Sequence, residues 1–404
     1  MQLIDGGVCA AKGFRAGGIH CGIRKNKEKK DLAMYVCETR CAAAAMHTQN
    51  LVKGAPNTVT AEHLQDGYAQ AMICNSGIAN TCAADGIEKA KAMCELAGEA
   101  LGVDPQDVVV ASTGVIGPSI DLGPIQNGMA SLVADLSVDG NTRAAQAIMT
   151  TDTHEKQAAV EFELDGKICR LGGMAKGSGM IMPNMATMLC FLTTDAAISP
   201  QMLQAALRET VCDTFNMVSV DGDTSTNDMV SLLASGLAGN RQITCQDQDY
   251  AVFKDALFTV LRVLSKAIAK DGEGATKLIE CNVQGAYDRE SARKIAKSVI
   301  NSSLLKAAVF GADANWGRVL CAIGYAGAQV DVRRVDVAFA SAAGSVDVCK
   351  NGAGIPVDEA FATRVLSEDE IQINIRLGDG DAAATAWGCD LTYDYVKING
   401  DYRS

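Results

Sequence analysis

The chain has 404 residues, of which 48% are hydrophobic and only 5% aromatic, with 39 glycines. This length exceeds that of a typical single domain and predicts two lobes or two subunits, while the many small residues favour closely packed α/β layers over an aromatic-rich binding module. The formal net charge of −12 argues against a nucleic-acid partner, and the one basic cluster, KNKEKK at 25–30, includes a glutamate and is expected to form a solvated turn.

The first half of the chain alternates between predicted strands and helices. The apolar runs QAMIC at 70–74 and DVVVA at 107–111 are typical of short buried strands. Between them, the apolar residues of 85–101 recur at helical spacing. Glu88 lies three residues after the aspartate that opens this stretch, as in a capping box. Residues 140–149 predict another helix.

A hairpin and two more helices are predicted farther along. The runs EFEL and KICRL alternate with period two, and the DG between them supplies a tight turn. A strand is predicted from Leu189, a helix opened by Ser199 and Pro200, and a longer amphipathic helix over 249–270. The C-terminal segment 395–404 is predicted to be strand-like. This alternation, without a linker or repeat, predicts a layered α/β sandwich.

Cysteine usage indicates the compartment. The chain has 15 cysteines without a CxxC pair and four scattered histidines, so neither a zinc site nor a disulfide framework is expected. Reduced thiols that act as small hydrophobic side chains explain the cysteines best and predict a cytoplasmic protein. The N-terminus lacks a basic region followed by an apolar one, and no run of about twenty apolar residues occurs, so no membrane partner is expected.

The bond between Ala186 and Thr187 is the most informative point in the chain. It lies in KGSGMIMPNMATMLCFLTTD, residues 176–195. A threonine hydroxyl is a weak nucleophile near neutral pH because its proton is hard to remove. If the chain is cut before Thr187, the new α-amino group, with an ordinary pKa of about 7.7–8.0, can accept the proton from the hydroxyl of its own residue. An isolated ATML also fits a methionine-rich core strand that follows a glycine loop.

The whole segment resembles the self-processing site of the ornithine acetyltransferase family, also called the bifunctional glutamate N-acetyltransferases. The resemblance runs from near residue 10 to the C-terminus and includes CNSGIAN, STGVIGP, SVDGDTSTND and GADANWGRV in the expected order. It implies autocatalytic cleavage into an α chain, residues 1–186, and a β chain, residues 187–404. It also implies an αββα sandwich akin to N-terminal-nucleophile folds and an α2β2 heterotetramer.

The resemblance assigns the oxyanion hole to Thr113 and Gly114 of STGVIGP. This motif directly follows the predicted strand VVVA. A backbone N–H group and a hydroxyl at the end of a strand suit the stabilisation of a tetrahedral intermediate. On the residues alone, an ordinary glycine-rich turn is the alternative.

The resemblance also implies the substrate-binding residues Thr150, Lys176, Glu273, Asn399 and Ser404. The ammonium group of Lys176 can pair with a substrate carboxylate, and Glu273, flanked by glycines in DGEGATK, can meet a substrate amine. On the residues alone, Lys176 is an exposed lysine in a turn and Glu273 a solvated side chain beside a C-cap glycine.

Two details of these assignments stay open. In the TTDT run at 150–153 a shift of one residue would move the contact to another threonine, and Asp152 there can instead form a cap or turn. For the tail to reach a substrate, side chains such as Tyr395, Ile398 and Tyr402 must dock it. SVDGDTSTND is expected to form a hydrogen-bonded turn near the site and not a calcium loop.

The activity implied is acyl transfer by an N-terminal threonine. Thr187 attacks the acetyl carbonyl of N2-acetyl-L-ornithine, and L-glutamate then takes the acetyl group from the ester, by ping-pong kinetics, in arginine biosynthesis. No metal or organic cofactor is needed. Some family members also use acetyl-CoA as donor, and nothing in this sequence decides that point. CNSGIANTCAADG lacks the threonine-glycine expected after its cysteine and AAAAMHTQN matches loosely, which leaves fine substrate specificity open.

Two other functions remain as alternatives. The first is a self-processing N-terminal-threonine amidohydrolase, such as the β-peptidyl aminopeptidases, in which water instead of an amine resolves the acyl-enzyme. The second is a non-enzymatic amino-acid-binding protein, in which Thr187 is only structural and the chain stays uncut. A site with both Lys176 and Glu273 placed for amino acids favours the transferase, because it positions the second amine.

Overall fold

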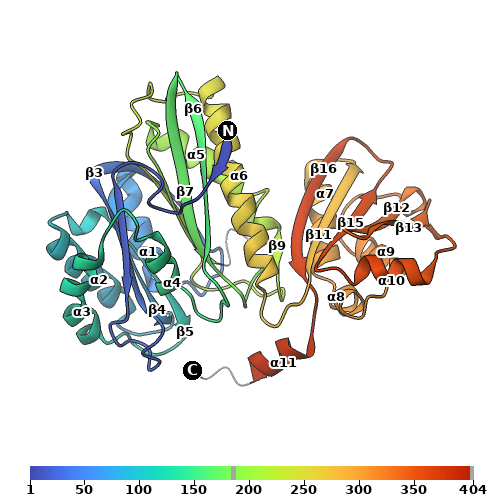
Figure 1. Cartoon of the computed structure of the whole chain (residues 1–404), viewed down its shortest axis with the longest axis horizontal. Coiled ribbons are helices and arrows are strands. Elements are labelled where there is room, and N and C mark those ends of the chain that lie inside the picture. The colour runs from blue at the N-terminus through green and yellow to red at the C-terminus, as the bar shows by residue number, and fades with distance from the viewer. Residues whose placement is uncertain (183–187, 401–404) are drawn as a thin grey trace.

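The computed structural model describes residues 1–182 and 188–400. Two mixed sheets with helices packed around them make up this part of the chain (Figure 1). The layered α/β class expected from the sequence is confirmed. Ala186, Thr187 and Ser404 lie outside the described residues.

The first sheet has nine strands within the described residues. Its members are β1 (Gln2–Ile4), β2 (Phe14–Ile19), β3 (Leu32–His47), β4 (Tyr68–Ile78), β5 (Val108–Val115), β6 (Lys156–Leu164), β7 (Lys167–Lys176), β8 (Leu189–Thr194) and β10 (Met229–Ala234). The strand order is β1-β6-β7-β8-β10-β3-β4-β5, and β2 pairs with β3. Two strands from after residue 187, β8 and β10, therefore lie side by side between strands from before it.

The second sheet has seven strands within the described residues, in the order β14-β13-β12-β15-β11-β16-β9. Their bounds are β9 (Val218–Ser219), β11 (Leu278–Ala286), β12 (Asp336–Ser341), β13 (Gly344–Lys350), β14 (Ala353–Gly354), β15 (Glu370–Arg376) and β16 (Ala382–Cys389). All seven follow residue 187.

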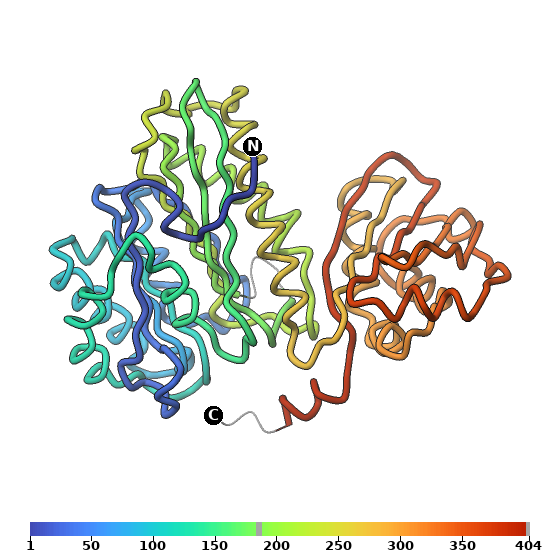
Figure 2. The backbone as a smooth tube through the Cα atoms, viewed as in Figure 1, coloured from blue at the N-terminus to red at the C-terminus, as the bar shows by residue number. Residues whose placement is uncertain are grey.

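Helices cover both sheets. They are α1 (Ala55–His63), α2 (Gly86–Leu101), α3 (Leu122–Asp135), α4 (Asn141–Ala147), α5 (Pro200–Val211), α6 (Gln248–Lys270), α7 (Arg289–Ile300), α8 (Ser303–Phe310), α9 (Trp316–Gly324), α10 (Glu359–Leu366) and α11 (Tyr393–Gly400). Helix α6 contacts β6 and β7 of the first sheet and β11 and β16 of the second, so it joins the two sheets. Helix α11 leaves the second sheet and extends back toward the first (Figure 2).

The core follows from apolar residues on both faces of the strands. In β3, Met34 packs with the apolar cluster under α1–α3, and the next residue, Tyr35, packs with the cluster on the opposite face. There Tyr35 makes edge-to-face contacts with Phe14 and Phe191, at ring-centroid distances of 6.1 and 6.4 Å. A larger cluster joins the first sheet to the second through α5 and α6. Burial on both faces explains why these strands read as continuous apolar runs.

Most predicted elements are confirmed. The runs at 70–74 and 107–111 lie within β4 and β5, and the predicted helices correspond to α2, α4, α5 and α6. The hairpin is β6–β7, and its turn residues Asp165 and Gly166 have φ angles of 49° and 69°, as a type I′ turn requires. Ser199 caps α5, because its Oγ accepts a hydrogen bond from the Met202 N–H.

Two local predictions are wrong. The Asp85 side chain makes no hydrogen bond to the start of α2; it accepts one from the Ser119 hydroxyl at 2.7 Å instead, so the capping box does not form. The described part of the C-terminal segment, residues 395–400, lies in the helix α11 and not in a strand. The Thr392 hydroxyl accepts the Tyr395 N–H, and the Asn399 amide donates to the Tyr395 carbonyl one turn earlier, so local contacts satisfy this backbone without a neighbouring strand.

The fifteen cysteines are all unpaired thiols, and most of them are buried. Among the described residues, no group of three or more His, Cys, Asp or Glu side chains is arranged to hold a metal ion. None of the helices in 1–182 and 188–400 has the length and apolarity needed to cross a membrane. The cluster KNKEKK forms an exposed turn, as predicted.

Candidate active site

A cavity of about 290 Å³ lies where the ends of several first-sheet strands meet the C-terminal helix. It is lined by the end of β5, the end of β7, the start of β8, the loops before β6 and β10, the loop after α6, and α11. The lining residues are Ala79, Thr113, Gly114, Val115, Ile116, Thr150, Thr151, Lys176, Gly179, Met180, Met188, Leu189, Ser225, Thr226, Asn227, Asp228, Glu273 and Asn399. This volume suits a small molecule of amino-acid size.

The cavity brings together six of the residues that the sequence singled out. They are spread over 287 positions of the sequence, and all of them line this cavity: Thr113, Gly114, Thr150, Lys176, Glu273 and Asn399. The predicted nucleophile Thr187 lies outside the described residues, but its neighbours Met188 and Leu189 line the cavity. The catalytic and substrate-binding roles assigned to these residues stay predictions.

Gly114 is required where it stands. Its φ is +130°, and a Cβ there would lie 2.3 Å from the carbonyl carbon of Gly77 on the neighbouring strand β4. Gly77 and Gly114 are direct partners in the parallel β4–β5 pair. This close approach turns the backbone at the end of β5, where the Thr113 side chain is 9% exposed and lines the cavity.

Lys176 ends β7 and is buried, in contrast to the exposed lysine that the residues alone suggest. Burial lowers its pKa, and the negative charge of Asp152, 4.0 Å from the Lys176 Nζ atom, acts in the opposite direction. Burial by itself would raise the pKa of Asp152. The charges of Lys176 and Lys156 outweigh that effect, so the Asp152 pKa lies well below its ordinary value. Asp152 is therefore ionised at neutral pH.

Asp152 also shapes the loop that contains Thr150. Its carboxylate accepts the N–H of Thr150 at 2.9 Å and the N–H of Gly177 at 2.7 Å. The turn formation that the residues allowed for Asp152 is thus present. Both Thr150 and Thr151 line the cavity, so the question of which threonine contacts a substrate stays open between these two.

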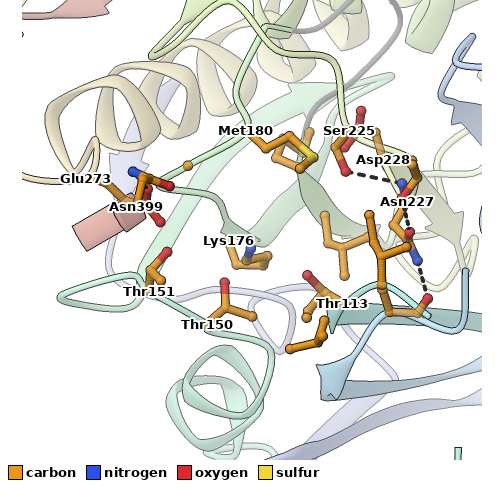
Figure 3. Close-up of a pocket in the computed structure, with 18 residues that line it drawn as sticks. Thr113, Thr150, Thr151, Lys176, Met180, Ser225, Asn227, Asp228, Glu273 and Asn399 are labelled. Carbon is orange, nitrogen blue, oxygen red and sulfur yellow. Dashed lines mark hydrogen bonds between the residues drawn. The ribbon is translucent and has the colours of Figure 1, made fainter. Parts of the chain in front are cut away.

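Glu273 and Asn399 form the opposite side of the cavity from Asn227 and Asp228 (Figure 3). The Asn399 amide donates to the Glu273 carboxylate at 2.8 Å, which attaches α11 to the loop after α6. Glu273 is 7% exposed, and a Cβ at Gly179 would collide with its carboxyl group at 2.3 Å. The glycine in KGSGM therefore makes room for this carboxylate.

The predicted docking of the tail is only partly present. Tyr395 is half-buried, but Ile398 is 37% exposed, and Tyr402 lies outside the described residues. The polar contact of Asn399, which the sequence placed in substrate binding, provides the attachment instead. Ring contact between Phe310 and Tyr393, 5.8 Å between centroids, anchors the start of α11.

Sequence reasoning did not single out Asn227 and Asp228, although their stretch SVDGDTSTND was expected near the site. The Asn227 amide donates to the Ser112 carbonyl at 2.9 Å, which ties this loop to β5. Asp228 is 2% exposed, and its Oδ2 atom has no hydrogen-bond partner within the described part of the chain. Burial raises its pKa well above the ordinary value. The clustering of polar residues just before an apolar strand was the available signal.

A buried ammonium group, buried carboxyl groups and several hydroxyl and amide groups around a small cavity define a site for a compact zwitterionic molecule, within an α/β-layered protein. The sequence pattern of the ArgJ family matches residues 15–404, and the chain belongs to this family. The resemblance noted from the sequence is confirmed.

Relatives match along the whole chain. The arginine biosynthesis bifunctional protein ArgJ of Symbiobacterium thermophilum is 52% identical over 406 residues, covering 100% of both chains. The protein of the same name from Bacillus subtilis is 47% identical over 403 residues, covering 99% of this chain and 97% of that protein. Among solved structures, ornithine acetyltransferase from Mycobacterium tuberculosis, complexed with ornithine, is 35% identical, with a TM-score of 0.42. The match covers 46% of this chain and 99% of that one.

Proposed function

We propose that this chain is a glutamate N-acetyltransferase that moves the acetyl group of N2-acetyl-L-ornithine to L-glutamate in the cyclic pathway of arginine biosynthesis. Membership of the ArgJ family supports the proposal, together with full-length relatives named as arginine biosynthesis bifunctional proteins. The observation that carries it is the single cavity shared by Thr113, Lys176 and Glu273, with Met188 on its wall.

The nucleophile in this proposal is Thr187, released by cleavage of the Ala186–Thr187 bond. The chain then consists of an α part, residues 1–186, and a β part, residues 187–404. Met188 lines the cavity and follows Thr187 directly in the chain, which supports this choice. The α-amine that cleavage exposes serves as the base for the Thr187 hydroxyl.

The transfer occurs in two steps. In the first, the Thr187 oxygen bonds to the acetyl carbon, the carbon–nitrogen bond of acetylornithine breaks, and the hydroxyl proton passes through the α-amine to the departing ornithine nitrogen. Thr113 and Gly114 donate to the oxyanion of the intermediate. In the second, the amine of glutamate attacks the acetyl ester, and its proton returns to the Thr187 oxygen.

The charges in the cavity suit both amino acids. The α-carboxylate that both substrates carry matches the ammonium group of Lys176, and the free side-chain ammonium group of acetylornithine matches the carboxylate of Glu273. Asn399 and Thr150 add polar contacts, and Ser404 completes the proposed set from the C-terminal tail. No metal or organic cofactor takes part in these steps; acetyl-CoA is included only as a second donor substrate, in line with relatives named bifunctional.

The assembly and location are also proposals. We infer an α2β2 heterotetramer. Two strands of the β part, β8 and β10, lie between strands of the α part in the first sheet, which supports the association of each α part with its own β part. We place the protein in the cytoplasm, which the unpaired state of its cysteines supports.

Intact-mass spectrometry of the purified protein beside a Thr187→Ala variant tests the proposal. We expect two fragments in the parent, split between Ala186 and Thr187, and one full-length species in the variant. The parent should then form N-acetylglutamate from acetylornithine and glutamate. A folded parent that stays full length would remove the α-amine from the mechanism. Release of acetate and ornithine at an unchanged rate without glutamate would instead indicate the amidohydrolase.

A further inference from the structure

Lys156, at the start of β6, is a buried cation outside the cavity lining. Its side chain is 0% exposed. Its Nζ atom lies 2.8 Å from Asp152 Oδ1 and 2.5 Å from Asp271 Oδ2, and 3.4 Å from the His154 carbonyl oxygen. One ammonium group therefore joins the loop before β6 to the residue that follows α6.

The contact with Asp152 leads to one wall of the cavity. The Asp152 carboxylate accepts the N–H group of Thr150, two residues earlier in the loop before β6, and the N–H group of Gly177, which directly follows β7. It also lies 4.0 Å from the Nζ atom of Lys176. The position of Asp152 thus sets both the Thr150 backbone and the Lys176 ammonium group.

The contact with Asp271 leads to the side of the cavity that Glu273 forms. The Asp271 carbonyl accepts the Ser178 hydroxyl at 2.6 Å, and the Ser178 carbonyl accepts the Glu273 N–H at 3.0 Å. The Asp271 carboxylate also accepts the Thr153 N–H at 3.1 Å. The loop that carries Glu273 is therefore fastened to the segment after β7 at the point where Asp271 meets Lys156.

We propose that Lys156 is a positioning residue of the active site, which holds the Lys176 wall and the Glu273 wall of the cavity at a fixed separation through Asp152 and Asp271. The proposal rests on the function proposed above for the role of these two walls. The ammonium groups of Lys156 and Lys176 balance the charges of the Asp152 and Asp271 carboxylates. Without Lys156, Lys176 is the cation of the described residues that still pairs with Asp152, and the carboxylate draws that ammonium group out of the cavity.

The test compares a Lys156→Met variant with a Lys277→Met control. Lys277 is also partly buried, and its Nζ atom donates to two carbonyl groups, of Val309 in α8 and Leu366 in α10; none of these three residues lines the cavity. We expect Lys156→Met to raise KM for both acetylornithine and glutamate about tenfold or more, since misplacement of binding groups weakens substrate orientation. The control should lower Tm and leave both KM values unchanged.

A crystal structure of each variant gives a readout that does not depend on activity. In Lys156→Met the Lys176 Nζ atom should move from 4.0 Å to hydrogen-bond distance of Asp152. If Lys156→Met does not fold, the charge-balanced Lys156→Met/Asp271→Asn variant replaces it. That variant should recover stability and keep the raised KM values.

The proposal would be overturned if Lys156→Met or Lys156→Met/Asp271→Asn kept the KM values of the parent and kept the Lys176 Nζ atom 4.0 Å from Asp152. Recovery of KM together with Tm in the double variant would do the same, since Lys156 would then be only structural. Lack of acetyl transfer by the parent protein is a separate result that bears on the proposed function. The position of Lys176 in the variant structures would still decide the role of Lys156.

Discussion

Thr113 and Gly114 stand side by side at the end of β5 for different physical reasons. Gly114 is fixed by sterics, because any Cβ would overlap the backbone of Gly77. Thr113 is subject to no such restriction, and its side chain lines the cavity. The chemistry proposed for this turn therefore rests on a backbone conformation that only glycine permits and on a hydroxyl that can be removed without disturbing that conformation.

This separation predicts the effect of a Thr113→Val substitution. Valine keeps the shape and removes the hydroxyl, so Tm should be unchanged and kcat for acetyl transfer should fall about 10²–10³-fold, the usual effect of losing one oxyanion donor. Steady-state kinetics with both substrates would measure this. Ser112→Ala is the control: this buried hydroxyl has no hydrogen-bond partner among the described residues, and its loss should leave kcat unchanged. A kcat that falls in Ser112→Ala and stays unchanged in Thr113→Val would exclude the oxyanion role of Thr113.

At the scale of elements, α11 differs from the other α-helices of the described residues in having no buried residue. It is attached by the Asn399–Glu273 hydrogen bond, by the Thr392 hydroxyl, which donates to the Gly274 carbonyl at 2.6 Å, and by the Tyr393 ring. Such a helix contributes little to the stability of the core, but it brings a polar side chain into the cavity.

A chain truncated after Thr392 should therefore fold with an almost unchanged Tm. Its KM values for acetylornithine and glutamate should rise about tenfold to a hundredfold. Truncation removes the Asn399 amide, and a hydrogen bond to a charged group contributes about 1.5–3 kcal/mol of binding free energy. The single substitution Asn399→Ala should reproduce part of this rise, while Val396→Ala, at an exposed position of the same helix, should not. A large loss of Tm on truncation would show that α11 supports the core after all.

At the scale of the whole molecule, the first sheet is built from both sides of residue 187. Strand β8 pairs with β7 on one side and β10 on the other, and β10 pairs in turn with β3. The backbone hydrogen bonds of two strand pairs, β7–β8 and β10–β3, thus cross between residues 1–182 and residues 188–400. A cut in the connection would leave these bonds, and the apolar cluster behind them, in place.

The two fragments of the cleaved protein should consequently behave as one particle. Size-exclusion chromatography under native conditions should elute them together, at the volume of the uncut Thr187→Ala variant, and separation should require denaturant. Separation of the fragments in native buffer would contradict the interleaved sheet.

How far the sequence predicted this protein depended on the range of each interaction. The β6–β7 hairpin and the helices α5 and α6 were predicted correctly, since alternation, helical spacing and capping residues act over a few neighbours. The helix start at Asp85 was predicted correctly, but its capping box was wrong, because the hydroxyl of Ser119, 34 positions away, donates to the Asp85 carboxylate. The tail prediction was wrong over residues 395–400, because their composition suggested a strand, whereas none of the described strands pairs with them.

The candidate site shows the same division. Thr113, Lys176 and Glu273 were recognised because each lies in a motif that can be read locally. Asp228 and Lys156 were not, although both are buried beside the same cavity. Lys156 meets Asp271 across 115 positions, and no local pattern distinguishes a lysine in such a pair from one that faces solvent.

The sequence by itself determined most of the elements, the family and six of the residues around the cavity, because periodicity and motifs are properties of neighbouring residues. Only the tertiary structure decided that Lys176 is buried, that Asn399 holds a helix against Glu273, and that Lys156 joins two walls of the site. The burial and charge pairing of these groups depend on which strands and loops lie side by side. That arrangement arises only when the strands before and after residue 187 assemble into one sheet.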